Sequence, residues 1–128
     1  NGLKDALKPT GKGLITFSPL AQGLLTNRYL NGIPQDSRIV TDGRFLKAAR
    51  LTPALLSQLH ALNALAAERG QTLAQMALCW VMKDSDVTSV LVGASRKAQI
   101  LDNLGIVNAT PLSAQELAEI DRITACGA

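Results

Sequence analysis

The residues best suited to chemistry lie between Gly93 and Lys97, where a glycine, a serine and two cations follow one another. Gly93 allows a ligand to approach the backbone closely, and Ser95 stands where a helix N-cap is expected. A helix N-terminus presents unpaired N–H groups and a partial positive charge. With Arg96 and Lys97 on the first helical turn, this stretch therefore predicts a phosphate-binding site. A plain strand-to-helix connection with solvated basic residues is the alternative.

The elements around this turn are a strand and a helix. Residues 88–92 are β-branched or apolar without alternation, which predicts a strand buried on both faces, as in a parallel sheet. The helix after the turn has an apolar face formed by Ala98, Ile100, Leu101 and Leu104.

A second short strand is predicted at residues 13–18, and it too ends in a loop with Ser and Gly. The apolar residues between 24 and 51 show no helical or strand periodicity, which predicts a long irregular loop. This loop carries the basic residues Arg28, Arg38, Arg44, Lys47 and Arg50.

Three helices with clear starting signals are also predicted. Thr52-Pro53 opens a helix that ends at Gly70, with Leu55, Leu59, Leu62 and Ala66 inward. Capping boxes open the other two, at Thr72/Gln75 and at Ser113/Glu116. Their inward residues are Leu73, Met76, Ala77, Trp80 and Val81 in one, and Leu117, Ile120 and Ile123 in the other.

Strands that alternate with helices predict an α/β fold with a parallel sheet. Two strands alone do not enclose a core, so residues 1–128 are interpreted as an incomplete domain, the terminal portion of a (β/α)8 barrel. In such barrels the loops after the last two strands hold phosphates. The opening segment resembles a helix end, which also suggests a piece of a longer chain.

Composition narrows the possible functions. The chain of 128 residues has a net charge of +3 without a basic block, which favours small anions over nucleic acid. Cys79 and Cys126 are far apart and have no CxxC spacing, so no zinc site or disulfide framework is predicted, and a cytoplasmic location is expected. No apolar run approaches the ~20 residues of a membrane span.

Several ordered blocks resemble the aldo-keto reductase family. They are FSPLAQGLLTNRY at residues 17–29, NGIPQDSR at 31–38 and SVLVGAS at 89–95, followed by Gln99 and Asn103. The chain is most similar to the C-terminal third of that barrel, in the branch that contains potassium-channel β subunits and bacterial L-glyceraldehyde 3-phosphate reductases.

The resemblance implies an NADPH site. The loop Ser18, Pro19, Leu20, Ala21, Gln22 and Gly23 would lie along the pyrophosphate, and Arg28 and Arg38 would reach the phosphates. Gly93, Ser95 and Arg96 match positions around the adenosine 2′-phosphate, and Gln99, Asp102 and Asn103 match those around the adenine. The chain has Asn27-Arg28 where this branch often has Gly-Lys, so a planar guanidinium replaces a point charge.

The catalytic Asp, Tyr, Lys and His of the family lie on earlier strands and have no counterpart among these residues. The single Tyr, Tyr29, matches the cofactor loop, and the single His, His60, lies mid-helix, where a solvated or packing role is expected. Trp80 is expected in the core. No catalytic residue and no metal ligand is therefore assigned, and the chain alone is predicted to be inactive.

The resulting expectation is the cofactor-binding portion of an NADPH-dependent reductase of small aldehydes and ketones, without nucleic-acid or membrane partners and with a possible homo-oligomer. One alternative is a non-catalytic NADP-binding or channel-regulatory module of the same fold. Another is an inert fragment that associates with itself.

Overall fold

The computed structural model describes residues 2–35, 37–41 and 47–125, apart from the side chains of Arg38 and Thr41. Its α-helices are α1 (Leu3–Leu7), α2 (Arg38–Thr41), α3 (Pro53–Glu68), α4 (Leu73–Val81), α5 (Lys97–Leu104) and α6 (Ala114–Ala125). Its strands are β1 (Leu14–Phe17) and β2 (Val87–Leu91). Short 3-10 helices are η1 (Lys8–Thr10), η2 (Ala21–Gly23), η3 (Asn27–Tyr29), η4 (Ala48–Arg50) and η5 (Gly105–Asn108).

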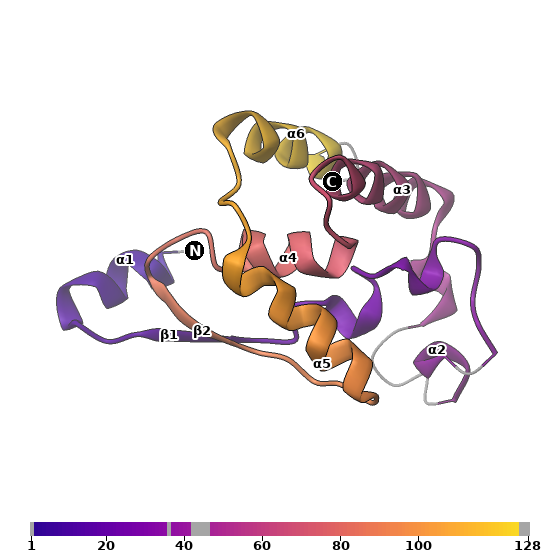
Figure 1. Cartoon of the computed structure of the whole chain (residues 1–128), viewed down its shortest axis with the longest axis horizontal. Coiled ribbons are helices and arrows are strands. Elements are labelled where there is room, and N and C mark those ends of the chain that lie inside the picture. The colour runs from indigo at the N-terminus through magenta and orange to yellow at the C-terminus, as the bar shows by residue number, and fades with distance from the viewer. Residues whose placement is uncertain (1, 36, 42–46, 126–128) are drawn as a thin grey trace.

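The two strands pair in parallel, as predicted, with Phe17 opposite Leu91. Figure 1 shows them side by side, away from the paired helices α3 and α6. Between 24 and 51 the described residues form only short helices, which confirms the irregular loop there. Arg44 and Cys126 lie outside the described residues.

The prediction that the strand at residues 88–92 is buried on both faces is wrong, and its partner β1 is exposed as well. Val87 is buried, but Ile15, Phe17 and Leu91 are 67%, 78% and 64% exposed. A strand face is buried only where another layer covers it. Among the described residues each strand has one neighbouring strand, and the exposed side chains share the uncovered face.

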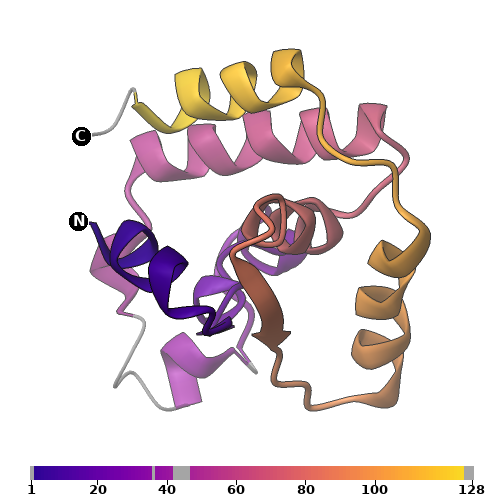
Figure 2. The ribbon, with the colours of Figure 1, turned by 90° about the vertical axis from the view of Figure 1, so that its left-hand side faces the viewer.

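The hydrophobic core lies among three helices instead of over the sheet. Figure 2 shows α3 and α6 packed along each other. The core residues are Leu59, Leu62 and Ala66 from α3, Leu73 and Met76 from α4, and Ile120 and Ile123 from α6. The inward stripe predicted for α3 is therefore confirmed, with Leu55 half-buried at the edge. In α6 the stripe is confirmed at Ile120 and Ile123, whereas Leu117 is only half-buried.

Two predicted apolar faces are wrong in part. In α4 the buried residues include Ala74 and Leu78, whereas Trp80 is 39% exposed and has the Lys83 ammonium 3.9 Å from its ring centroid. In α5 the single buried residue is Asn103, a polar one. The predicted inward residues of that helix are exposed because no described element covers them: Ala98, Ile100, Leu101 and Leu104.

The helix starts follow the predicted caps. The Thr52 hydroxyl accepts a hydrogen bond from Leu55 N at 3.2 Å. In the first capping box, Thr72 Oγ1 accepts from Gln75 N at 3.2 Å and Gln75 Oε1 accepts from Thr72 N at 3.0 Å. The box at Ser113 has the same form. Gly70, with φ +69°, ends the α3 region.

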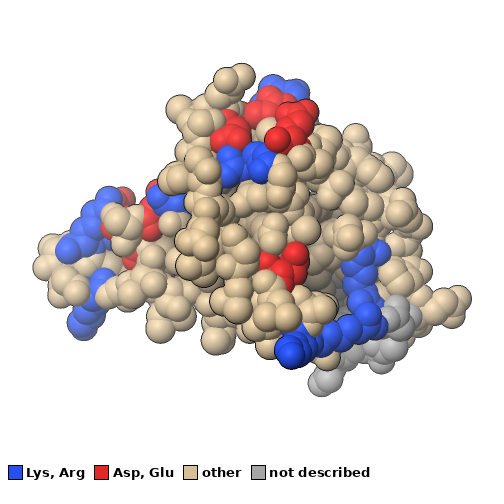
Figure 3. Space-filling view, in the orientation of Figure 1, with Lys and Arg blue, Asp and Glu red and all other residues tan. Residues whose placement is uncertain are grey.

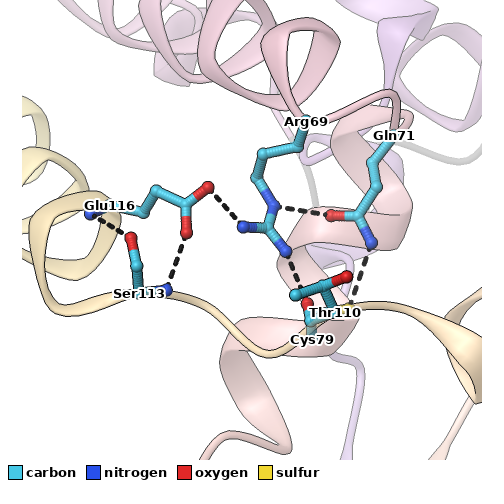
Figure 4. Close-up of polar contacts among 6 residues, drawn as sticks. All are labelled: Arg69, Gln71, Cys79, Thr110, Ser113 and Glu116. Atoms are coloured by element: carbon cyan, nitrogen blue, oxygen red, sulfur yellow. Dashed lines mark hydrogen bonds and ion pairs between the residues drawn. The ribbon is translucent and has the colours of Figure 1, made fainter.

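A polar cluster joins the end of α3 to the start of α6 (Figure 4). The Arg69 guanidinium is 8% exposed and pairs with Glu116, while its Nε donates to Gln71 Oε1 at 2.9 Å and its second terminal nitrogen donates to Thr110 O at 2.7 Å. This cluster fixes the helical layer that supports α4.

Candidate nucleotide-binding site

A groove of about 1040 Å³ opens where the two parallel strands end. Because Phe17 and Leu91 are partners in the ladder, the loops that follow them leave the sheet at the same edge. The far wall comes from α5, from the start of α4 and from η3. The site therefore lies at the carboxyl ends of the strands, where α/β folds bind ligands.

The loop after β1 has an unusual backbone. Ser18, Ala21 and Gln22 have positive φ values of 52°, 47° and 63°, a region that residues with a Cβ seldom adopt. Ala21 N donates to Ser18 O at 3.0 Å and Gly23 N donates to Leu20 O at 2.9 Å, so local turns hold this shape. Strained backbone of this kind is concentrated at ligand-binding sites.

The turn before α5 differs from the prediction in one respect. Arg96, not Ser95, occupies the N-cap, with extended φ and ψ of −139° and 142°. The Gln99 side-chain oxygen accepts from the backbone N–H groups of Ser95 and Arg96, at 2.9 and 3.1 Å. These two donors are thus satisfied within the protein, so the phosphate-binding capacity of the turn depends on the side chains and on the next N–H groups of the helix.

Within the described part of the chain, two cations line the groove. Arg96 stands at the α5 N-terminus, and Arg28 is carried by η3, whose start is capped by the Thr26 hydroxyl through a 3.2 Å hydrogen bond from Arg28 N. Lys and Arg side chains gather over the N-terminal end of α5 in Figure 3. Arg38 begins α2, but its side chain lies outside the described residues.

The α5 end of the groove is polar and partly buried. Asn103 is 9% exposed and lines the groove, and no hydrogen bond of its side chain is found within the described part of the chain. Asp102, next to it, is held by α4: its two carboxylate oxygens accept from Gln75 Nε2 at 3.2 Å and from the Thr72 hydroxyl at 3.3 Å. The carboxylate of Asp102 is therefore engaged by α4, whereas the amide of Asn103 lies at the groove.

Nearly all residues predicted for the cofactor come together in this groove. Those that line it are Ser18, Pro19, Leu20, Gln22, Gly23, Arg28, Gly93, Ser95, Arg96, Gln99, Asp102 and Asn103. Ala21 shapes the loop without lining the groove. Thr72 and Ala74 also line the groove and were not predicted to do so. The sequence indicates the capping box at Thr72 but not that this box lies close to the ends of the strands.

The other candidate side chains lie elsewhere or are buried. Tyr29 lines the groove but is 1% exposed, and the ring packs below the loop, 3.8 Å from where a Cβ on Gly23 would lie. His60 is exposed on α3, as expected for a solvated histidine. Among the described residues no group of His, Cys, Asp or Glu could hold a metal ion, and no helix is long and apolar enough to cross a membrane.

Comparison with known proteins places this arrangement in a family. Residues 1–125 match the model described as "Aldo/keto reductase family". The L-glyceraldehyde 3-phosphate reductase of Escherichia coli K12 is 52% identical over 130 residues, covering 99% of this chain and 38% of that protein. A probable voltage-gated potassium channel subunit beta of Oryza sativa subsp. japonica is 38% identical, covering 90% of this chain and 35% of that protein.

Solved structures agree on the fold. The glycerol dehydrogenase of Gluconobacter oxydans superposes with a TM-score of 0.74 at 22% identity, covering 97% of this chain and 37% of that one. An aldo-keto reductase of Bacillus halodurans in its holo form gives a TM-score of 0.63 at 24% identity, covering 94% of this chain and 36% of that one. The chain thus spans little more than a third of the length of these relatives, and its elements form part of their barrel. It belongs to the aldo-keto reductase family.

Proposed function

We propose that this chain forms the nucleotide-binding part of an NADPH-dependent reductase that converts small aldehydes or ketones into alcohols. One observation carries the proposal: two loops and one helix, far apart in sequence, bring the predicted cofactor residues to a single groove. The family and its reductase relatives support the reaction class.

The groove suits an elongated, anionic nucleotide. We assign the pyrophosphate to the loop of residues 18–23, whose residues with positive φ lie along the groove, with Arg28 beside it. We assign the 2′-phosphate to Arg96 and Ser95, and the adenine to Asn103. A guanidinium offers planar paired donors that match phosphate oxygens, which an ammonium does not.

NADPH, when bound, supplies a hydride. The residues of this chain bind and orient the nucleotide, and we assign none of them to proton transfer. Tyr29 is buried beneath the cofactor loop and His60 lies outside the groove, so neither is placed to protonate a carbonyl oxygen.

The proposal is tested by replacing Arg96 in the full-length protein. If Arg96 pairs with the 2′-phosphate, Arg96→Ala should weaken NADPH binding by roughly 1.5–3 kcal/mol, the range for a hydrogen bond to a charged group. NADH, which lacks that phosphate, should change by about 0.5 kcal/mol or less. Fluorescence quenching measures both affinities.

Lys12→Ala is the control, because Lys12 is an exposed cation before the start of β1, at the end of that strand away from the groove, and does not line the groove. It should leave both affinities near wild type. Equal losses of NADPH and NADH in Arg96→Ala would place the 2′-phosphate elsewhere, and absence of any nucleotide binding by the wild type would refute the proposal.

A non-catalytic, channel-regulatory role is the second candidate, favoured by the similarity to potassium channel β subunits. The two roles share the groove and differ in turnover. Steady oxidation of NADPH by the full-length protein with glyceraldehyde 3-phosphate would favour the reductase, and binding without turnover would favour the regulatory module. In either case we propose a cytoplasmic location, which the free thiol of Cys79 suits.

A further inference from the structure

A polar bridge links the start of α4 to the C-terminal half of α5. Gln75 Nε2 donates to the backbone oxygen of Asp102 at 2.7 Å and to its carboxylate at 3.2 Å, and the Thr72 hydroxyl donates to the other carboxylate oxygen at 3.3 Å. The same Gln75 and Thr72 form the capping box of α4. One pair of side chains therefore both starts α4 and holds α5.

The bridge accounts for a glycine as well. A Cβ on Gly105, at the end of α5, would lie 2.7 Å from Gln75 Nε2, closer than real side-chain contacts. Glycine at this position leaves room for the Gln75 amide to reach the Asp102 carbonyl.

Among the described residues, apolar burial does little to hold α5 in place. Ile100, Leu101 and Leu104 are 49%, 58% and 57% exposed, so the described part of the chain buries little of the apolar surface of this helix. Hydrogen bonds to α4 must then supply much of the orientation that burial supplies for α3 and α6.

We propose that the Thr72/Gln75 capping box positions α5 and thereby forms the adenosine end of the groove, with Gln75 and Asp102 as positioning residues. This inference rests on the proposed nucleotide function. It reassigns Asp102, which was predicted to flank the adenine: its carboxylate oxygens are engaged by α4, and its neighbour Asn103 faces the groove. Movement of α5 would displace Asn103, Gln99 and Arg96 together.

The test uses Gln75→Glu in the full-length protein. The new carboxylate still accepts from Thr72 N, so the α4 cap remains, but it donates nothing and faces the Asp102 carboxylate. Affinity for adenosine 2′,5′-bisphosphate, measured by calorimetry, should fall roughly tenfold, a loss within the usual range for coupled neighbours. Adding Asp102→Asn supplies an amide donor toward Glu at position 75 and should recover most of the affinity.

Gln58→Glu is the matched control, because Gln58 Nε2 also donates to a helix carbonyl, Ile123 O at 2.9 Å, far from the groove. It should leave the affinity unchanged. Without nucleotide, hydrogen exchange in α5 should quicken in Gln75→Glu and stay at the wild-type rate in Gln58→Glu, an outcome that separates positioning from general loss of stability.

The outcomes distinguish the two proposals. If the wild type binds no adenosine 2′,5′-bisphosphate, the proposed function fails and this inference fails with it. If the wild type binds it and Gln75→Glu binds equally well, or if the double variant shows no recovery, this inference alone is overturned. Should Gln75→Glu not fold, Asp102→Ala, which removes the carboxylate acceptors and leaves the α4 capping box intact, should lower the affinity and quicken hydrogen exchange in α5.

Discussion

The carboxylate of Glu116 holds together three parts of the helical layer. It accepts a hydrogen bond from Ser113 N at 2.7 Å and pairs with the Arg69 guanidinium (Figure 4). The backbone N–H of Glu116 donates in turn to the Ser113 hydroxyl, which completes the cap of α6. The hydrogen bonds from Ser113, followed by the contact with Arg69, lower the pKa of Glu116 from 4.5 to about 2.

The lowered pKa of Glu116 predicts that the free energy of unfolding falls at acidic pH. Because the pKa is lower in the folded state, ionised Glu116 stabilises the native protein fully above pH 4.5, and the stabilisation is lost as the pH falls toward 2. Glu116→Gln should lower the free energy of unfolding at pH 7 by roughly 1.5–3 kcal/mol, since it leaves Arg69, 8% exposed, without its charge partner. Urea denaturation at pH 7 and pH 3 measures this, and the variant should differ less from wild type at pH 3.

Glu119→Gln serves as the comparison on the same helix. Glu119 pairs with Arg122 at the surface, three residues along α6, and solvent screens such pairs. Its replacement should cost much less than that of Glu116. Similar costs for the two variants would mean that the Arg69 cluster contributes no more than a surface ion pair.

At the scale of elements, the helix boundaries could be predicted from sequence because their signals are local. Thr52-Pro53 and the boxes at Thr72 and Ser113 act within one turn, and each helix begins where they indicate. Burial is not local. The exposure of Phe17 and Leu101 depends on which elements cover them, and the sequence patterns of these segments match those of buried ones.

The same distinction applies to the groove. Its two loops carry recognisable motifs, so their residues were predicted, whereas Thr72 and Ala74 reach the groove only because α4 packs beside α5. The N-cap of α5 shifted by one residue because the Gln99 side chain, not Ser95, satisfies the N–H groups of the turn. Such competition between nearby partners is decided by geometry that a pattern does not contain.

The start of β1 offers a test of strand packing. A Cβ on Gly13 would lie 2.2 Å from Thr88 Oγ1 and 3.0 Å from Thr88 Cβ, so a side chain there forces the strands apart. Gly13→Ala should lower the free energy of unfolding by roughly 1–3 kcal/mol, the usual cost of overpacking. Thermal denaturation of full-length variants measures the loss.

Two further variants make that result specific. Adding Thr88→Ala removes the clashing hydroxyl and should restore part of the stability. Gly93→Ala, where a Cβ would meet nothing within 4 Å, should change the stability by about 0.5 kcal/mol or less. If the loss of stability persists unchanged in the double variant, Gly13 is needed for its backbone conformation and not to avoid a clash with Thr88.

At the scale of the whole molecule, the uncovered sheet determines how these 128 residues behave by themselves. Ile15 and Phe17 lie on one face of β1, Leu91 continues that face on β2, and all three are more than 60% exposed. Each strand also has a partner on one side alone among the described residues, so the other edge presents unpaired N–H and carbonyl groups. Both features favour association between copies.

We therefore expect the isolated 128-residue chain to associate with itself at micromolar concentration. Replacing Ile15 and Phe17 by Thr keeps a strand-forming residue at each position but removes apolar surface, and it should shift the equilibrium toward monomer. His60→Ser, an exposed change on α3, is the control and should leave the association unchanged. Sedimentation velocity distinguishes these cases. A compact monomer for the unmodified chain would contradict the expectation, because it would show that the exposed sheet face and the open strand edges stay solvated and do not bind a second copy.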